Sequence, residues 1–154
     1  LGVEIIQYPP EKDKTDLELA LELVVERGYN QVMLVGALGG RLDHTLANLH
    51  LLSHPRWEKI ELRLFDVCEE AWLVGKHTRI SGTPGDRVSL IPLSEYAEGV
   101  RTAGLQYPLQ GEKLYRWMTR GVSNQMLTTQ ADVWSESGLL LCIHTRIAVF
   151  KQCC

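Results

Sequence analysis

A strand-like run and a helical run meet at the sequence GALGGRLDH, residues 36–44. Residues 31–35 before it are apolar enough for a short buried strand, and residues 43–53 after it have the apolar spacing of a helix. Glycines at such a junction make a tight turn that other residues adopt with difficulty. Because open α/β sheets bind ligands where strands give way to helices, the stretch predicts an α/β layer with a ligand site at one edge. The helical leucines expected to face inward are Leu42, Leu46 and Leu49.

Another helix is predicted upstream, because apolar residues recur at helical spacing over residues 17–24. Thr15 precedes this run as a candidate N-cap, and Glu18 three residues later completes a capping box. Gly28 follows as a C-terminal stop. Two more strand-like runs come before residue 75. The order helix, strand, helix, strand is typical of an α/β layered domain.

The chain changes in charge and in pattern near Gly75. Residues 1–75 hold 13 acidic and 7 basic residues, a balance of −6, whereas residues 76–154 hold 6 acidic and 9 basic residues, a balance of +3. After residue 75, short strand-like runs separated by glycine and proline replace the helical spacing, as in a small antiparallel sandwich or barrel. We therefore expect a domain boundary near Gly75. The strand-like runs before this boundary span residues 60–65 and 71–74. Those after it span residues 87–91, 99–103, 105–109, 121–124, 131–134 and 139–143.

The composition is that of an ordinary globular protein, since 45% of the 154 residues are hydrophobic and 23% are charged. A net charge of −3 gives no general reason to bind nucleic acid or an anionic membrane. No apolar run approaches the roughly 18 residues that a membrane span needs. The four cysteines form no C-x-x-C pair, which excludes a zinc ribbon and favours a reduced, cytoplasmic location. We expect Cys68 and Cys142 in the core, and Cys153 and Cys154 in the tail.

Two carboxylates stand at the start of the first predicted helix. Asp13 and Asp16, in the run KDKTD at residues 12–16, offer oxygen ligands of the kind that Mg²⁺ prefers. The simpler interpretation is that Asp16 complements the helix dipole and that Thr15 caps the helix. By spacing alone the simpler interpretation is favoured, because acidic residues are common in first turns.

The glycine loop is the second candidate site. Backbone amides of Gly39 and Gly40, a helix N-terminus and the side chain of Arg41 together make a possible phosphate cradle. The loop is neither a Walker A sequence nor a dinucleotide-binding glycine pattern. The alternative is a tight turn in which Asp43 is the helix N-cap. The residues themselves leave these two interpretations about equal.

Histidines and tryptophans give weaker signals. The helical histidines lack the glutamate of a zinc-protease motif, so we expect them on the helix surface. The tryptophans are expected to serve packing rather than ligand binding. These residues are His44, His50 and His54, and Trp57, Trp72, Trp117 and Trp134.

Four stretches, taken together and in this order, resemble the motifs of bacterial thiamine pyrophosphokinases. They are PEKDKTDLE at residues 10–18, GALGGRLDHTLAN at 36–48, TAGLQYPL at 102–109 and GVSN at 121–124. The resemblance runs from about residue 3 to residue 143. It implies transfer of the pyrophosphoryl group of ATP to thiamine, giving thiamine diphosphate and AMP, with Mg²⁺ as cofactor. It also implies a homodimer with thiamine bound between the subunits, and no nucleic acid or membrane as partner.

The resemblance further implies an architecture and roles for particular residues. Residues 1–75 would be part of a Rossmann-like three-layer α/β catalytic domain, and residues 76–154 an antiparallel β-sandwich for thiamine binding and dimerisation. The catalytic group would comprise Asp13, Asp16, Arg41 and Asp43, with Asp16 as metal ligand. The nucleotide would be bound by Lys12, Thr15, Gly39, Gly40 and Arg41. Thiamine would be bound by His44, Asn48, Tyr107, Ser123 and Asn124, of which Ser123 and Asn124 face the partner subunit's pocket.

One motif of the family is missing. The acidic sequence Asp-x-Asp-Ser, which supplies Mg²⁺ ligands in the family, does not occur in these 154 residues, and the chain begins with Leu1 rather than Met. We therefore expect a piece of a longer enzyme, with an incomplete α/β layer and no activity by itself. The alternatives are a thiamine-binding, dimerising β-domain without catalysis, and a purely structural fragment.

Overall fold

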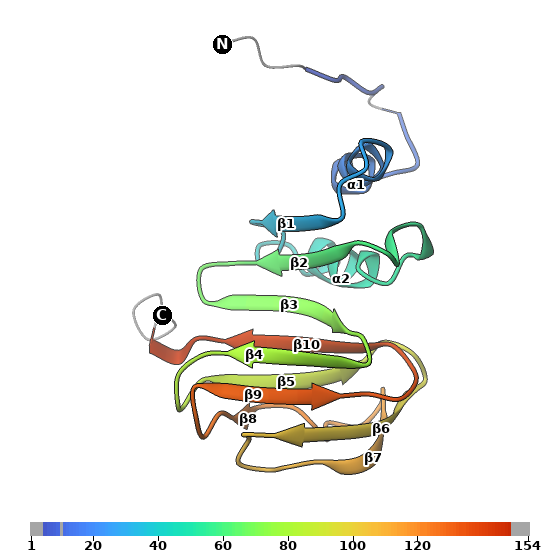
Figure 1. Cartoon of the computed structure of the whole chain (residues 1–154). Helices are drawn as coiled ribbons and strands as arrows, with labels where there is room; N and C mark the ends of the chain where they lie inside the picture. The colour runs from blue at the N-terminus through green and yellow to red at the C-terminus, as the bar shows by residue number, and fades with distance from the viewer. Residues whose placement is uncertain (1–4, 10, 149–154) are drawn as a thin grey trace.

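The structure is a computed structural model that describes residues 5–9 and 11–148 (Figure 1). Two α-helices and a short 3₁₀ helix are interspersed with the first two strands, and eight further strands follow along the described residues. The helices are α1 (Asp16–Glu26), α2 (Leu42–Leu51) and η1 (Pro55–Trp57). The strands are β1 (Gln31–Val35), β2 (Glu61–Phe65), β3 (Glu69–Val74), β4 (His77–Ser81), β5 (Arg87–Pro92), β6 (Tyr96–Ala103), β7 (Gln110–Tyr115), β8 (Asn124–Gln125), β9 (Gln130–Trp134) and β10 (Leu140–Thr145).

A six-stranded sheet runs through the whole molecule, in the order β1-β2-β3-β10-β5-β8. Only β1 and β2 are parallel; the other pairs are antiparallel. The pairing of β3 with β10, from Leu140 opposite Val74 to Thr145 opposite Glu69, joins the early and late parts of the chain (Figure 1). The domain boundary near Gly75 therefore stays a prediction, because one sheet extends across it.

A four-stranded antiparallel sheet, in the order β4-β9-β6-β7, packs against one face of the six-stranded sheet. The larger core cluster contains Leu140 and Cys142 of β10 together with Ile80 and Val133 of the second sheet. This confirms the predicted antiparallel sandwich.

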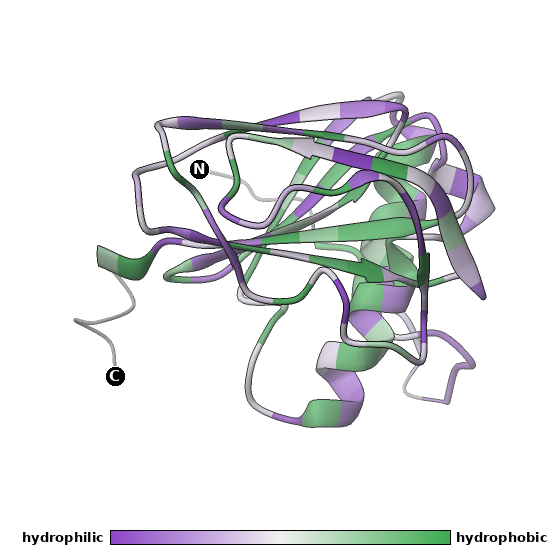
Figure 2. Cartoon of the chain, turned by 90° about the horizontal axis from the view of Figure 1, so that it is seen from below, coloured by the Kyte–Doolittle hydropathy of each residue, from purple (hydrophilic) through white to green (hydrophobic). Residues whose placement is uncertain are grey.

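The two α-helices cover the opposite face of the six-stranded sheet, so three layers follow one another (Figure 2). Leu21 of α1 and Leu64 of β2 belong to the smaller core cluster, together with Leu141 of β10. Side chains alternate between the faces of a strand, which places Leu141 among the helices and its neighbours Leu140 and Cys142 in the sandwich. β10 thus serves both cores.

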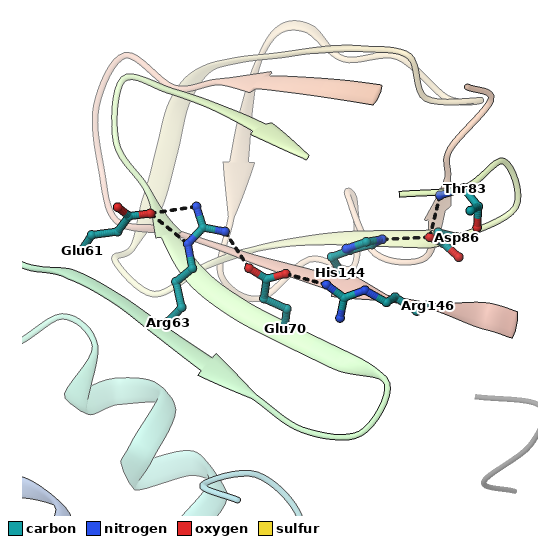
Figure 3. A network of polar contacts seen from close by, with 7 residues as sticks. All are labelled: Glu61, Arg63, Glu70, Thr83, Asp86, His144 and Arg146. Atoms are coloured by element: carbon teal, nitrogen blue, oxygen red, sulfur yellow. Dashed lines mark hydrogen bonds and ion pairs between the residues drawn. The ribbon is translucent and has the colours of Figure 1, made fainter. Parts of the chain in front are cut away.

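A buried polar cluster connects the turn before β5 to the end of β10. Asp86 Oδ2 accepts a hydrogen bond from the Thr83 amide at 2.9 Å and contacts His144 Nε2 at 3.1 Å (Figure 3). Its Oδ1 accepts from the Ile147 amide at 3.0 Å. Asp86 and His144 are almost completely buried. A Cβ atom at Gly82 would lie 2.7 Å from Asp86 Oδ2, so only glycine leaves room for the carboxylate.

A second polar network lies beside it, on β2, β3 and the residues after β10. Glu70 accepts from Arg63 Nη1 at 2.6 Å and from Arg146 Nη2 at 3.0 Å (Figure 3). The Arg63 guanidinium also lies 4.8 Å from the ring centroid of Trp72. The network ties the α/β part to the sandwich through charges that neutralise one another.

Several predicted elements are confirmed. Thr15 caps α1, with its Oγ1 accepting from the Glu18 amide at 3.2 Å. β1 spans the five predicted residues, but the prediction that this strand is buried is wrong, because β1 is an edge strand with Met33 and Val35 exposed. Trp57 and Trp72 are buried, as is Cys142, whose burial raises the pKa of its thiol. Cys153 and Cys154 lie outside the described residues. Within the described part of the chain, no helix is long and apolar enough to cross a membrane.

Other predictions are wrong. Residues 105–109 form a loop instead of a strand, anchored by the buried side chains of Leu105 and Leu109. Residues 121–123 form a turn, and only Asn124 of the strand predicted at 121–124 lies in a strand, β8. β4 and β7 were not predicted, since edge strands bury one face only and carry many polar residues. Leu42 is 73% exposed and Leu46 is also exposed, so of the three helical leucines only Leu49 packs against the core.

Candidate functional site

The glycine loop, residues 36–40, lies at the carboxyl edge of the parallel pair β1 and β2. Gly39 and Gly40 have φ angles of +82° and +67°, in the left-handed region that glycine adopts without strain. Asp66 follows β2 at the same edge, and a Cβ atom on Gly39 would lie 3.8 Å from its Oδ2. Asp66 was not predicted from the sequence. The available signal was that Asp66 directly follows the strand predicted at residues 60–65, which the structure shows to be parallel to β1.

Two side chains of α2 hold this loop in place by hydrogen bonds to its backbone. Asn48 Nδ2 donates to the Ala37 carbonyl at 2.8 Å, and Thr45 Oγ1 donates to the Gly39 carbonyl at 3.1 Å. Asn48 was predicted to bind thiamine, but its amide nitrogen is occupied by the loop backbone. The bracing holds the loop in a fixed shape at the start of α2.

Arg41 and Asp43 form a bidentate pair on the loop. Arg41 Nε donates to Asp43 Oδ1 at 3.1 Å, and Nη2 donates to Oδ2 at 2.5 Å. The hydrogen bond from Arg41 lowers the pKa of the Asp43 carboxyl, and a further bond from the His44 amide acts in the same direction. Arg41 occupies the N-cap position and α2 begins at Leu42, so the alternative with Asp43 as N-cap is wrong. Because Arg41 is exposed, its outer donors remain open to an anion.

The acidic run before α1 is solvent-exposed. Lys12 Nζ forms an ion pair with Asp16, whose side chain is 90% exposed in the first turn of the helix. Asp13 is also exposed. Thr15 uses its hydroxyl as the N-cap and, with Asn48, lines a groove of about 450 Å³ between α1 and α2. The groove brings Thr15 and Glu18 of the first motif next to Ala47 and Asn48 of α2.

The carboxylates that could bind Mg²⁺ stand singly and do not form a preassembled site. Among residues 5–9 and 11–148 no three His, Cys, Asp or Glu side chains cluster as a metal site. Mg²⁺ commonly keeps several waters and needs one or two carboxylates in addition to substrate phosphates. Asp16 and Asp13 fit that requirement, whereas they do not form a cage of protein ligands. His54 serves structure, since its Nδ1 accepts from the Arg56 amide and its ring stacks on Trp57 at 4.4 Å.

A separate cavity of about 570 Å³, the Tyr107 pocket, opens at the far end of the sandwich. Two aromatic side chains on its wall are exposed, Tyr107 by 60% and Trp117 by 63%. The prediction that Trp117 is a packing residue is therefore wrong; its neighbours Arg116 and Met118 in a turn were the missed signal. The pocket is lined by Tyr107, Leu109, Trp117, Met118, Thr119, Arg120, Gly121, Val122 and Asn124.

Charges in the Tyr107 pocket are balanced. Arg120 donates from Nε and Nη2 to the two carboxylate oxygens of Glu112, at 2.9 and 2.8 Å. The same hydrogen bonds lower the pKa of the Glu112 carboxyl. Since the guanidinium is neutralised by its partner, the pocket does not repel a cationic ligand.

Ser123 and Asn124 differ in what they offer a ligand. Ser123 is exposed and has a φ angle of +58°, a strained conformation for a residue other than glycine, while its amide donates to Ser89 Oγ at 3.0 Å. Asn124 is 6% exposed, and its side chain bonds to the backbone of Tyr107. Strained residues cluster at functional sites, which makes Ser123 the stronger of the two candidates for direct contact.

The two groups of predicted site residues lie at opposite ends of one sheet. The glycine loop follows β1, the first strand of the six-stranded sheet, and Asn124 belongs to β8, the last. Five strand spacings of about 4.8 Å put these edges about 24 Å apart. A single molecule of the size of thiamine cannot touch both groups of one chain.

Both parts of the chain match models of one protein family. Residues 1–64 match the model described as thiamin pyrophosphokinase, catalytic domain, and residues 77–140 match thiamin pyrophosphokinase, vitamin B1 binding domain. Thiamine pyrophosphokinase of Bacillus subtilis is 29% identical over 140 residues, which are 90% of this chain and 65% of the relative. Thiamine pyrophosphokinase 1 of Arabidopsis thaliana is 29% identical over 156 residues, 95% of this chain and 58% of the relative.

Solved structures agree with these matches. The crystal structure of thiamine pyrophosphokinase from Bacillus subtilis superposes with a TM-score of 0.80 at 28% identity, covering 88% of this chain and 65% of that one. The structure of thiamin pyrophosphokinase from Geobacillus thermodenitrificans gives 0.77 at 30% identity, covering 90% and 64%. The chain thus spans less than two thirds of the length of these relatives.

Proposed function

Since the chain belongs to the thiamine pyrophosphokinase family, we propose that it carries out, or is part of a protein that carries out, ATP-dependent pyrophosphoryl transfer to thiamine. The hydroxyl oxygen of thiamine attacks the β-phosphorus of ATP, the bond from that phosphorus to the oxygen bridging it to the α-phosphorus breaks, and AMP leaves. The products are thiamine diphosphate and AMP. The observation that carries the proposal is the braced glycine loop with the exposed Arg41 at the start of α2.

The glycine loop supplies the donor half of the site. Amides of Gly39 and Gly40 and the N-terminus of α2 favour phosphate, and Arg41 adds charged donors. Phosphoryl transfer depends mainly on positioning and charge neutralisation, so these groups suffice without a covalent nucleophile. The hydroxyl proton passes to the Asp66 carboxylate at this edge and from there to water, since both oxygens of Asp43 already accept from Arg41. Lys12 and Thr15 complete the nucleotide contacts in this proposal, and His44 those to thiamine.

Magnesium accompanies the nucleotide in this proposal. Asp16, with Asp13 beside it, would hold a Mg²⁺–ATP complex through exposed carboxylate oxygens at the start of α1. When bound, the ion neutralises phosphate charge. Lys12 forms an ion pair with Asp16. In this proposal its ammonium group adds a positive charge, besides that of the Mg²⁺ ion, for the same phosphates.

The Tyr107 pocket supplies the acceptor half. Thiamine carries a flat, cationic thiazolium ring and a flat pyrimidine ring joined by a methylene group, and exposed aromatic side chains attract such cations through their π faces. Tyr107 and Trp117 provide those rings. The exposed Ser123, which stands in the chain between the lining residues Val122 and Asn124, would add a hydroxyl. The pairing of Arg120 with Glu112 removes an opposing charge.

A homodimer reconciles the two halves. Because the glycine loop and the Tyr107 pocket lie at opposite edges of one sheet, we propose that each active site takes its donor half from one chain and its acceptor half from a second copy. Isologous dimers form two such sites at once. We also propose a cytoplasmic location, which suits the unoxidised thiol of the buried Cys142.

A second candidate function is thiamine binding and dimerisation without catalysis. It is favoured by the exposure of the donor side: Met33 and Val35 of the edge strand β1 are largely uncovered, whereas the sandwich around the Tyr107 pocket has a complete core. An assay of AMP release with ATP, Mg²⁺ and thiamine separates the two. AMP release that depends on thiamine supports pyrophosphoryl transfer, and thiamine binding without AMP release supports the second function. A chain that shows no thiamine binding and no AMP release contradicts both functions.

Arg41→Lys is expected to raise the ATP concentration needed for half-maximal AMP release roughly tenfold, because lysine lacks the bidentate fork that suits phosphate oxygens. Arg101→Lys, at an exposed arginine of β6, is the control. If Arg41 only braces Asp43, the lysine variant keeps its ATP dependence, and Gly40→Ala alone is damaging through its positive φ.

In the full-length enzyme, Asp16→Asn is expected to lower turnover at least about tenfold, because it removes the charge proposed to face the metal and its phosphates. Its melting temperature should change little, since asparagine keeps the size and the side chain is exposed. Glu18→Gln removes a charge from the same first turn and serves as control. Unchanged steady-state kinetics of Asp16→Asn at saturating Mg²⁺ would remove Asp16 from the site.

A further inference from the structure

The side chain of Asn124 pairs with the peptide of Tyr107 as a neighbouring strand would. Its Nδ2 donates to the Tyr107 carbonyl at 2.7 Å, and its Oδ1 accepts from the Tyr107 amide at 3.0 Å. The same oxygen accepts from the Gln125 amide at 2.9 Å. With 6% of the residue exposed and both ends of the amide occupied, Asn124 has little left to offer a ligand directly.

The loop around Tyr107 depends on such outside contacts. Residues 106–109 belong to no strand, and Leu105 makes only an isolated bridge to Met126. The buried side chains of Leu105 and Leu109 fix the two ends of the loop. At its middle, Tyr107 has both backbone polar groups bonded to Asn124, while its ring is exposed on the wall of the pocket.

We propose that Asn124 is a positioning residue, which holds the Tyr107 ring in the acceptor pocket and influences thiamine only through it. The proposal rests on the proposed function for the identity of the ligand. It explains why the residue is asparagine: the pairing needs one acceptor and one donor at the reach of a short amide. Aspartate would place a carboxylate oxygen against the Tyr107 carbonyl, and alanine offers neither group.

The first measurement is hydrogen exchange at the Tyr107 amide. In Asn124→Ala we expect this amide to exchange at least about tenfold faster, because its acceptor is lost and the loop opens more often. Asn124→Asp keeps the size and the acceptor, and is expected to show a smaller acceleration; it is also the variant to use if Asn124→Ala does not fold. Gln125→Ala, at the next residue of β8, is the control and should leave the Tyr107 amide protected.

The second measurement is a double-mutant cycle on thiamine affinity with Tyr107→Ala. If Asn124 acts through Tyr107, each single variant weakens binding by a similar factor, and the double variant is no weaker than Tyr107→Ala alone. Multiplied losses in the double variant, or unchanged exchange at the Tyr107 amide in Asn124→Ala, contradict the positioning role and leave the proposed function standing. Absence of thiamine binding by the wild-type chain contradicts the proposed function instead.

Discussion

Asp86→Ala is expected to destabilise the chain by about 3–5 kcal/mol, because it leaves buried partners of the carboxylate without their acceptor. Asp86 is 2% exposed and accepts from the amides of Thr83 and Ile147 while facing His144. The variant therefore unpairs the turn before β5 and the end of β10 at once. Chemical denaturation of the wild type and the variant gives the difference directly.

The chain contains a matched control for this experiment. Asp132 also faces a histidine, His77, at 2.7 Å, and Arg79 at 3.0 Å, but on the outer face of the second sheet where water reaches the pair. Surface ion pairs contribute about 0–1 kcal/mol, so Asp132→Ala should cost far less than Asp86→Ala. Equal losses in the two variants would mean that burial of the Asp86 cluster is unimportant.

Acid should weaken the same cluster. Burial by itself raises the pKa of Asp86, but hydrogen bonds from the Thr83 and Ile147 amides and from His144 outweigh it, so the folded pKa lies below the ordinary value of 3.8. The unfolded chain then binds the proton more readily. The stabilisation is complete above that ordinary value and is lost as the pH falls through the lower, folded pKa. Asp86→Asn should therefore show a shallower loss of stability below about pH 4 than the wild type does.

Trp117→Ala is expected to weaken thiamine binding about 10- to 100-fold, the loss that removal of one stacking aromatic partner typically causes. Trp117 is exposed at the Tyr107 pocket and stacks on Tyr115 with a centroid distance of 5.1 Å, which supports the ring from behind. Calorimetric titration with thiamine measures the effect.

Trp134→Ala is the matched control for Trp117→Ala. Trp134 stacks on His77 at 5.0 Å on the outer face of the four-stranded sheet and does not line the Tyr107 pocket. Thiamine affinity should be the same in this variant as in the wild type. Equal weakening by both substitutions would point to a general loss of structure, and no weakening by Trp117→Ala would place the ligand elsewhere.

Local features of the fold could be predicted from the sequence because they depend on neighbours in the chain. The capping of α1 by Thr15 and the bracing of the glycine loop after β1 involve residues three to eleven positions apart. The edge strands β4 and β7 escaped prediction, since their single buried faces give too short a pattern. The continuous sheet through β3 and β10 joins residues about 70 positions apart, which no local pattern reveals.

The candidate site shows the same division. Motifs led to Arg41 and Asp43, which do pair on the glycine loop. The motifs could not show that the side-chain amides of Asn48 and Asn124 donate hydrogen bonds to backbone carbonyls, because that depends on which carbonyl each side chain reaches in the fold. The distance between the glycine loop and the Tyr107 pocket likewise appears only in three dimensions, because it depends on the order of the strands in the sheet.

Sedimentation equilibrium with and without thiamine tests the composite site most directly. If thiamine lies between the acceptor half of one chain and the donor half of another, bound thiamine must tighten the dimer, since a ligand that binds only the assembled state stabilises it. The account predicts a dimer at tens of micromolar whose dissociation constant falls when thiamine is added and does not fall in Trp117→Ala. A chain that stays monomeric at that concentration with saturating thiamine, or a dimer that thiamine leaves unchanged, would contradict it.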